Sequence, residues 1–163
     1  MCKSRPFSQP LGRAVLFLYT FSVYIGCMEQ VTFNIDPYIG AGPIKFGMTK
    51  AQVAKILGKP EHSGKTYTGR TDERRGPIAI RYNKKGKVDE ISFLDTVSVT
   101  FDGQDLFNSP KGLKFLETKE KPVSSYGFKI FFSLGIAVTG ISKKKEEKTV
   151  SVFAKELESL WKI

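Results

Sequence analysis

Residues 44–60 read Ile-Lys-Phe-Gly-Met-Thr-Lys-Ala-Gln-Val-Ala-Lys-Ile-Leu-Gly-Lys-Pro, and they carry the clearest local signal in the chain. Thr49 predicts a helix N-cap, because its hydroxyl can accept a backbone N–H while Gln52 reaches back to the N–H of the cap. Gly58 tolerates a positive φ and Pro60 prevents continuation, so the helix is expected to end there after about two turns. The apolar side chains expected on its inner face are Val53, Ile56 and Leu57.

Alternation of apolar and polar side chains predicts strands on both sides of this helix. The segments that alternate or are strongly apolar are 31–35, 78–82, 88–94, 97–101, 128–132, 134–138 and 149–153. Asn83-Lys-Lys-Gly86 predicts a hairpin connection with Gly86 at positive φ. Residues 61–77 are polar and rich in Gly, Thr and Arg, which indicates an exposed loop.

Two further short helical segments are expected near the C-terminus. Residues 111–120 place Leu113 and Leu116 inward, and a last helical turn carries Leu157, Leu160 and Trp161 toward the sheet. The fold class predicted is α+β, with an antiparallel sheet of about six strands and one well-defined short helix packed on it.

Length and composition favour one domain with its own core. The chain has 163 residues, of which 40% are hydrophobic, with 13 Phe and 6 Tyr. That supply of apolar side chains predicts a single α+β binding domain over residues 28–163. The net charge is +10, and residues 1–27 hold three basic and no acidic side chains, so the remainder carries +7. This excess favours acidic partners.

The first 27 residues have the order of an export signal. Basic side chains precede the apolar run 14–26, which is too short to span a bilayer, since spanning takes about 20 residues. Tyr24-Ile-Gly-Cys27 resembles a lipobox and makes Cys27 a lipidation candidate. The alternative is that translation starts at Met28. The first reading places the protein at a membrane or in the periplasm, and the second places it in the cytoplasm.

The residue inventory argues against metal, cofactor and enzyme chemistry. Both cysteines, Cys2 and Cys27, precede the predicted domain, and His62 is the only histidine, so we expect no metal site and no cofactor. Ser63-Gly-Lys-Thr66 has the wrong glycine spacing for a phosphate loop and follows a helix. Asp89 and Glu90 are neighbours on a predicted strand and should face opposite sides, which excludes a catalytic pair. We therefore expect a protein that is not an enzyme.

The helix stretch resembles a known fold. The motif that carries the resemblance consists of Gly47, Met48, Thr49, Gln52, Val53, Leu57, Gly58, Lys59 and Pro60. It resembles the helix motif of the small outer-membrane assembly lipoproteins of the β-barrel assembly machinery, and more loosely the repeat unit of β-lactamase-inhibitor-like proteins. The resemblance covers residues 44–94 and implies a helix followed by a variable loop and a hairpin. Residues 33–49 and 132–136 also resemble uncharacterised bacterial proteins associated with immunity to toxins. Both resemblances imply a non-catalytic recognition domain.

Basic side chains supply the candidate partner-binding residues. They are Arg70, Arg74, Arg75 and Arg81 in and after the predicted loop, with a second basic tip at Lys143, Lys144, Lys145 and Lys148. Arginine suits bidentate contact with carboxylates, so the first function predicted is an inhibitor-like or immunity-like module that binds an acidic protein surface and is monomeric when free. The alternative is an envelope assembly lipoprotein anchored through Cys27. Nucleic-acid binding is suggested by charge alone.

Overall fold

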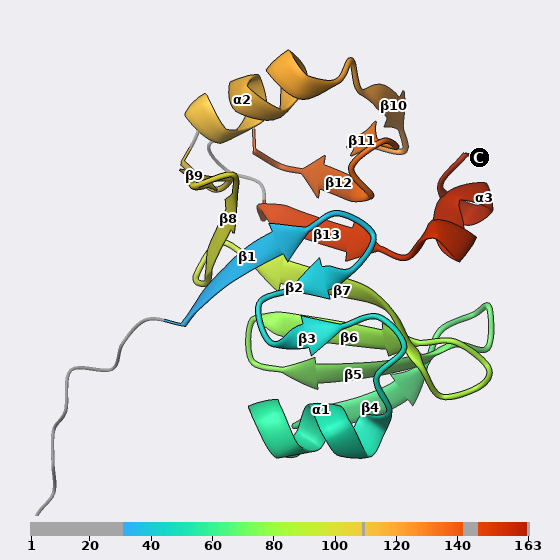
Figure 1. Ribbon diagram of the computed structural model, residues 1–163. Coiled ribbons are helices and arrows are strands. Elements are labelled where there is room, and N and C mark those ends of the chain that lie inside the picture. The colour runs from blue at the N-terminus through green and yellow to red at the C-terminus, as the bar shows by residue number, and fades with distance from the viewer. Residues whose placement is uncertain (1–30, 109, 142–146, 163) are drawn as a thin grey trace, which may run out of the picture.

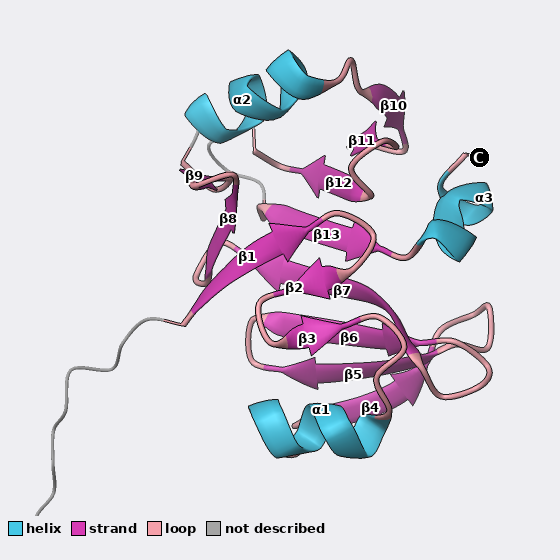
Figure 2. Cartoon of the chain, in the orientation of Figure 1, coloured by secondary structure: helices cyan, strands magenta, loops and turns pink. Residues whose placement is uncertain are grey.

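The computed structural model describes residues 31–108, 110–141 and 147–162, and the described strands form two sheets (Figure 1; Figure 2). The smaller sheet has five strands in the order β3-β2-β1-β8-β9. They are β1 (Thr32–Asp36), β2 (Gly40–Ala41), β3 (Ile44–Lys45), β8 (Ser98–Phe101) and β9 (Gln104–Asp105). β1 runs parallel to β8, and the other neighbours in this sheet are antiparallel.

The larger sheet has eight antiparallel strands in the order β10-β11-β12-β13-β7-β6-β5-β4. Their bounds are β4 (His62–Lys65), β5 (Thr71–Arg75), β6 (Ile78–Tyr82), β7 (Val88–Leu94), β10 (Val123–Ser125), β11 (Phe128–Phe131), β12 (Ile136–Thr139) and β13 (Thr149–Phe153). β7 lies near the middle of this sheet, with β6 on one side and β13 on the other. Each of its first six residues is buried, as expected of a strand covered on both faces.

The core lies between the two sheets. Phe33 of β1 packs on Phe93 of β7 with ring centroids 4.9 Å apart, and both rings are buried. A second apolar cluster lies where the end of the chain meets β11, β12 and β13, and it contains Ile130, Ala137, Phe153 and Leu157, with Trp161 packed against it. The predicted inward position of Leu157 is confirmed, whereas Leu160 is 44% exposed.

The described residues contain three short α-helices and one 3₁₀ turn. They are α1 (Lys50–Leu57), α2 (Lys111–Lys119), α3 (Glu158–Trp161) and η1 (Lys155–Leu157). The predicted capping box of α1 is confirmed, because Thr49 accepts from the N–H of Gln52 and the Gln52 side chain accepts from the N–H of Thr49. Gly58 follows the helix at φ +80°. Ile56 is 43% exposed rather than inward, because Val53 and Leu57 stack on one row and Ile56 lies beside it.

The α+β class is confirmed, but one sheet of about six strands with one helix is wrong. Two two-residue strands form at the turn around Gly42, and the parallel pairing of β1 with β8 creates a second sheet. The predicted exposed loop at residues 61–77 is also wrong, because it contains β4 and β5. Those strands lack an apolar alternation, since β5 reads Thr-Asp-Glu-Arg-Arg and buries a glutamate and an arginine.

A β-bulge overturns the expected orientation of Asp89 and Glu90. Arg81 of β6 pairs with Glu90, but the next residue, Tyr82, pairs with Val88, so Asp89 is the extra residue on β7. A bulge changes the direction of the side chains beside it. As a result, the two neighbouring carboxylates both contact the guanidinium of Arg70.

Candidate functional site

Three segments meet at the beginning of β7 and define the candidate site. The backbone N–H of Gly47 donates to the carbonyl of Val88 at 2.8 Å, and the N–H of Val88 donates to the carbonyl of Met48 at 2.9 Å. The N–H of Ala154 donates to the carbonyl of Asp89 at 2.8 Å. The motif before α1 and the segment after β13 are therefore both hydrogen-bonded to the same end of β7.

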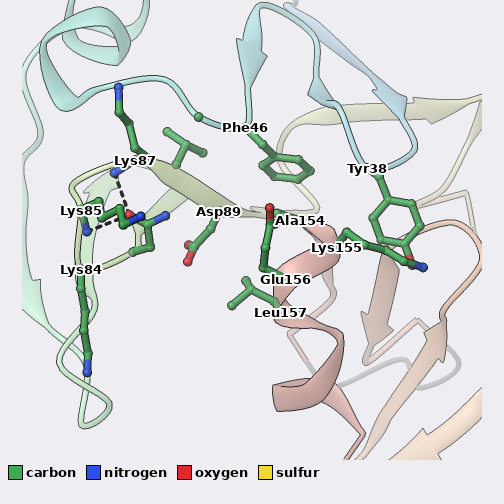
Figure 3. Close-up of a pocket in the computed structure, with 13 residues that line it drawn as sticks. Tyr38, Phe46, Lys84, Lys85, Lys87, Asp89, Ala154, Lys155, Glu156 and Leu157 are labelled. Carbon is green, nitrogen blue, oxygen red and sulfur yellow. Dashed lines mark hydrogen bonds between the residues drawn. The ribbon is translucent and has the colours of Figure 1, made fainter.

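The connection between β6 and β7 forms the third side of the site. The Asn83 side-chain oxygen accepts from the backbone N–H of Lys85 at 2.9 Å and of Lys87 at 3.1 Å, the bonds dashed in Figure 3. Gly86 has a φ of +72°, as predicted for this hairpin. These two hydrogen bonds hold residues 83–87 in a defined turn next to the two segments that are hydrogen-bonded to β7.

A cavity of about 640 Å³ lies between these three segments. Its apolar lining includes Phe46, Val88, Ala154 and Leu157, together with the ring of Tyr38. Its basic lining consists of Lys84, Lys85, Lys87 and Lys155. Figure 3 shows the hairpin lysines on one side, Phe46, Ala154 and Tyr38 on the other, and Asp89 between them. Asp89 and Glu156 are the acidic residues of the lining. The cavity is therefore amphipathic.

The three hairpin lysines, Lys84, Lys85 and Lys87, are exposed and carry uncompensated charge. In the described part of the chain, the lysines that form ion pairs are Lys45, Lys119, Lys129, Lys155 and Lys162. The hairpin lysines are not among them. Like charges held close together on a short turn attract an anionic partner. The hairpin is thus a concentrated positive edge on the cavity.

The opposite wall is held by an interaction between Tyr38 and Glu158. The Tyr38 hydroxyl donates to Glu158 Oε1 at 2.7 Å, and Lys155 forms an ion pair with the same carboxylate. The Lys155 ammonium also lies 4.6 Å from the centroid of the Tyr38 ring. The hydrogen bonds from Lys155 and Tyr38 lower the pKa of Glu158 to about 2. Lys155 is therefore partly neutralised, unlike the hairpin lysines.

Asp89 also lines the cavity and is paired with Arg70. Its carboxylate is buried, and burial raises its pKa above the ordinary value although the Arg70 guanidinium opposes this shift. Arg70 also donates to Glu90 Oε2 at 2.9 Å. The negative charge of Asp89 is compensated by Arg70, and Asp89 forms no ion pair with the hairpin lysines. Asp89 therefore does not neutralise their positive charge.

The candidate arginines predicted from the sequence are placed differently from one another. Arg70 is largely buried between Asp89 and Glu90, and Arg75 is buried and pairs with Glu73 at 2.9 Å. Arg74 is 61% exposed and lies 3.3 Å from Asp72. The predicted loop is wrong for Arg74 and Arg75, which are residues of β5, and the predicted exposure is wrong for Arg70 and Arg75, which belong to buried ion pairs. Their partner-binding role stays a prediction.

Arg81 and Arg74 do share one hollow. Arg81 is 27% exposed and pairs with Asp72 and Glu90. A hollow of about 260 Å³ includes both arginines, with Ser92, Ser151 and Trp161 among the other lining residues. The carboxylate of Glu90 lies in the same lining, so the positive charge there is balanced locally. The lysine-edged cavity also has carboxylates in its lining, Asp89 and Glu156, but neither of them is paired with the hairpin lysines, so the second hollow is the weaker anion site.

The sequence prediction missed the hairpin lysines as candidate binding residues. Residues 83–86 are predicted only as a hairpin connection, although the run Lys-Lys-Gly-Lys itself contains no acidic side chain. The acidic residues that follow it, Asp89 and Glu90, pair with Arg70. The motif residues Gly47, Met48 and Thr49 border the cavity or its hairpin, since Thr49 forms an isolated bridge with Lys87. The carbonyl of Gly58, by contrast, accepts from Arg75 Nε at 2.9 Å, so that end of the motif is structural.

Several residues predicted from the sequence to be functional are not among those that line the cavity. Cys27 and the basic tip residues Lys143, Lys144 and Lys145 lie outside the described residues. His62 is an exposed residue of β4 rather than part of a loop. Over residues 31–108, 110–141 and 147–162, no group of three or more His, Cys, Asp or Glu side chains is arranged to hold a metal ion. No helix in the same ranges is long and apolar enough to cross a membrane.

Comparison with known proteins was made by family, by sequence and by structure. No protein-family model, no curated protein and no solved structure matches the chain. The resemblance of residues 44–94 to assembly lipoproteins and inhibitor-like proteins, and the resemblance to immunity-type proteins, therefore stay predictions. Function has to be argued from the geometry of this chain.

Proposed function

We propose that this protein is a non-catalytic binding module that holds an acidic segment of another protein against the hairpin at residues 83–87. The function is of the inhibitor or immunity kind, in which binding itself is the activity. The lysine-edged cavity is the contact site, in place of the arginines on β5. Arg74 and Arg75 on β5, like Arg70 before it and Arg81 on β6, have carboxylate partners within the chain, whereas the hairpin lysines have none among the described residues.

One observation carries the proposal, namely three unpaired lysines on one turn at the edge of the cavity. Surface lysines scattered singly are ordinary, but these three share a turn that Asn83 holds in place by two hydrogen bonds. A rigid turn does not have to be ordered when a partner binds, so less of the interaction energy is lost on association. Carboxylates of a partner would complete the ion pairs that the chain itself leaves open.

The proposal is tested by recovery of a partner from the native host. The bait is the full chain, compared with a variant that has Lys84→Ser, Lys85→Ser and Lys87→Ser. A matched control carries Lys55→Ser, Lys59→Ser and Lys65→Ser, which removes the same charge from exposed positions around α1 and β4. We expect the wild type and the control to recover the same protein and the hairpin variant to lose it. The loss should be greatest at low salt, where ionic contacts are least screened.

Two results would contradict the proposal. Equal recovery of the same protein by both triple variants would remove the hairpin as the contact site. Recovery that disappears after nuclease treatment would show that the hairpin binds nucleic acid, for which salt dependence alone is no discriminator. Unfolding midpoints of all three baits should agree closely, since exposed and unpaired lysines contribute little to the free energy of unfolding.

A further inference from the structure

We infer that the bound segment combines carboxylates with one large apolar side chain, which enters the cavity while the carboxylates remain at the hairpin. This inference rests on the proposed function and specifies the chemistry of the partner. It comes from the two-sided lining of the cavity, with the three hairpin lysines on one side and, on the other, the apolar side chains together with the partly neutralised Lys155 and Glu156 (Figure 3). A purely acidic segment would use only half of that lining.

The apolar part of the lining is built into the fold. Val88, Ala154 and Leu157 are each less than 9% exposed, so their positions are set by the core. Phe46 is half-buried and packs against the same core while its ring faces the cavity in Figure 3. The backbone bonds between Gly47 and Val88 and between Ala154 and Asp89 fix these side chains relative to one another. The base of the cavity is therefore rigid and ready to receive an apolar group.

Charge decides which part of the partner goes deeper. Asp89 lines the cavity between the hairpin and residues 154–157 (Figure 3), and its buried carboxylate has Arg70 as its single cationic partner within the described residues. A second carboxylate placed there would be repelled by Asp89 and would lose its hydration. At the hairpin, by contrast, it would meet exposed ammonium groups and keep contact with water. The acidic groups of the partner therefore stay at the edge, and the apolar side chain occupies the interior.

The size of the cavity agrees with such an occupant. Sites that enclose a whole small molecule are commonly about 300–1,000 Å³ and mostly apolar, with a few polar groups that set orientation, so a cavity of that size has ample room for one large side chain. The volume of about 640 Å³ falls inside that range. Burial of one aromatic or large aliphatic side chain contributes about 1.5–3 kcal/mol, which corresponds to at least a tenfold gain in affinity.

The test uses defined peptides and the full chain. The probe is fluorescently labelled Glu-Asp-Phe-Glu-Asp, blocked at both ends, and the matched peptide is Glu-Asp-Ser-Glu-Asp. A third peptide, Gln-Asn-Phe-Gln-Asn, keeps the apolar side chain without charge. Fluorescence anisotropy should show the serine peptide binding about tenfold more weakly than the phenylalanine peptide. That ratio should persist as salt is raised, because salt weakens both peptides through the same ionic contacts.

A protein variant gives an independent readout of the same inference. Ala154→Met extends a side chain from the base into the cavity, so it should bring the two acidic peptides to nearly equal affinity. Its fold is checked by thermal unfolding, and the peptide pair on the wild type decides the question if this variant does not fold.

The outcomes separate the inference from the proposed function. Equal binding of the two acidic peptides, lost in the variant with all three hairpin lysines replaced, would overturn the apolar anchor and leave the acidic-partner function standing. Absence of binding by either acidic peptide would count against both. Strong binding of the uncharged peptide alone would show an apolar site that does not use the lysines, which contradicts the proposed function.

Discussion

Arg75 donates from Nη2 to Oε2 of Glu73 at a distance of 2.9 Å, and both side chains are buried. The Tyr82 hydroxyl donates to the same oxygen at 2.9 Å, and Arg75 Nε donates to the carbonyl of Gly58 at 2.9 Å. The ion pair thereby connects β5 with β6 and with the end of α1. Removing one member of a buried pair leaves the other charged group without compensation.

We therefore expect Arg75→Ala to lower the free energy of unfolding by about 3–5 kcal/mol. Arg74→Ala is the matched control, because Arg74 is the next residue on the same strand and is 61% exposed. Its effect should stay within about 0.5 kcal/mol. Chemical denaturation monitored by circular dichroism measures both values. Similar losses for the two variants would show that Arg75 has no special structural role.

The cluster around Arg70 gives a pH-dependent expectation. Arg70→Met removes the cationic partner of the buried Asp89 carboxylate, which should raise the folded-state pKa of Asp89 further above its ordinary value. The folded variant then binds more protons than the unfolded chain, so its stability should rise as pH falls through that raised pKa. Denaturation at several pH values checks this. The prediction would be contradicted if the variant's loss in free energy of unfolding, relative to the wild type, stayed the same as the pH was lowered.

The contact between Tyr38 and Glu158 predicts the opposite dependence on pH, namely a stability that falls on acidification. The folded-state pKa of Glu158 is about 2, below its ordinary value of 4.5, chiefly because Lys155 and Tyr38 donate to its carboxylate. Its contribution to stability should be complete above about pH 4.5 and should be lost as pH falls toward about 2. The variant Glu158→Gln should show a shallower loss of stability over this window. If the free energy of unfolding falls equally with pH in the wild type and the variant, Glu158 does not make this contribution.

Two glycines with similar backbones allow a test of steric packing. Gly135 has a φ of +64°, and a Cβ there would lie 2.9 Å from the carbonyl oxygen of Phe153 and 3.0 Å from the ring of Tyr38. Gly86 has a φ of +72° with nothing within 4 Å. Gly86→Ala should cost about 1–2 kcal/mol from backbone strain alone. Gly135→Ala should cost about 1–3 kcal/mol more, because its neighbours are backbone and a packed ring. Equal unfolding midpoints would show that the surroundings of Gly135 can adjust.

Local features of the fold were predictable from the sequence. The capping box at Thr49 and Gln52 and the turn at Gly86 depend on side-chain and backbone chemistry within four residues, so no distant contact could change them. The β5 strand was not predictable in the same way. Its buried residues, Glu73 and Arg75, are two positions apart and form an ion pair along the same face of the strand, so a pattern based on hydrophobicity does not reveal that they are buried.

The candidate site was hidden for a different reason. The hairpin lysines were visible in the sequence, but their meaning depends on a cavity whose other walls come from Phe46 and from residues 154–157. Likewise, the bulge that turns Asp89 toward Arg70 is a property of the pairing between β6 and β7 and has no signature in either strand alone. Contacts between distant segments decide both features.

The central position of β7 has a consequence for the order of folding during synthesis. Its partner β6 precedes it by a short hairpin, whereas its other partner, β13, is synthesised only after β8 to β12. Until then Ser92 lacks the Ser151 hydroxyl that lies 2.8 Å from its own, and one edge of β7 stays open. Pairings between distant segments form slowly, and open strand edges favour aggregation. The nascent chain therefore passes through a state that a chaperone would recognise, and completion of the larger sheet is the event that ends this exposure.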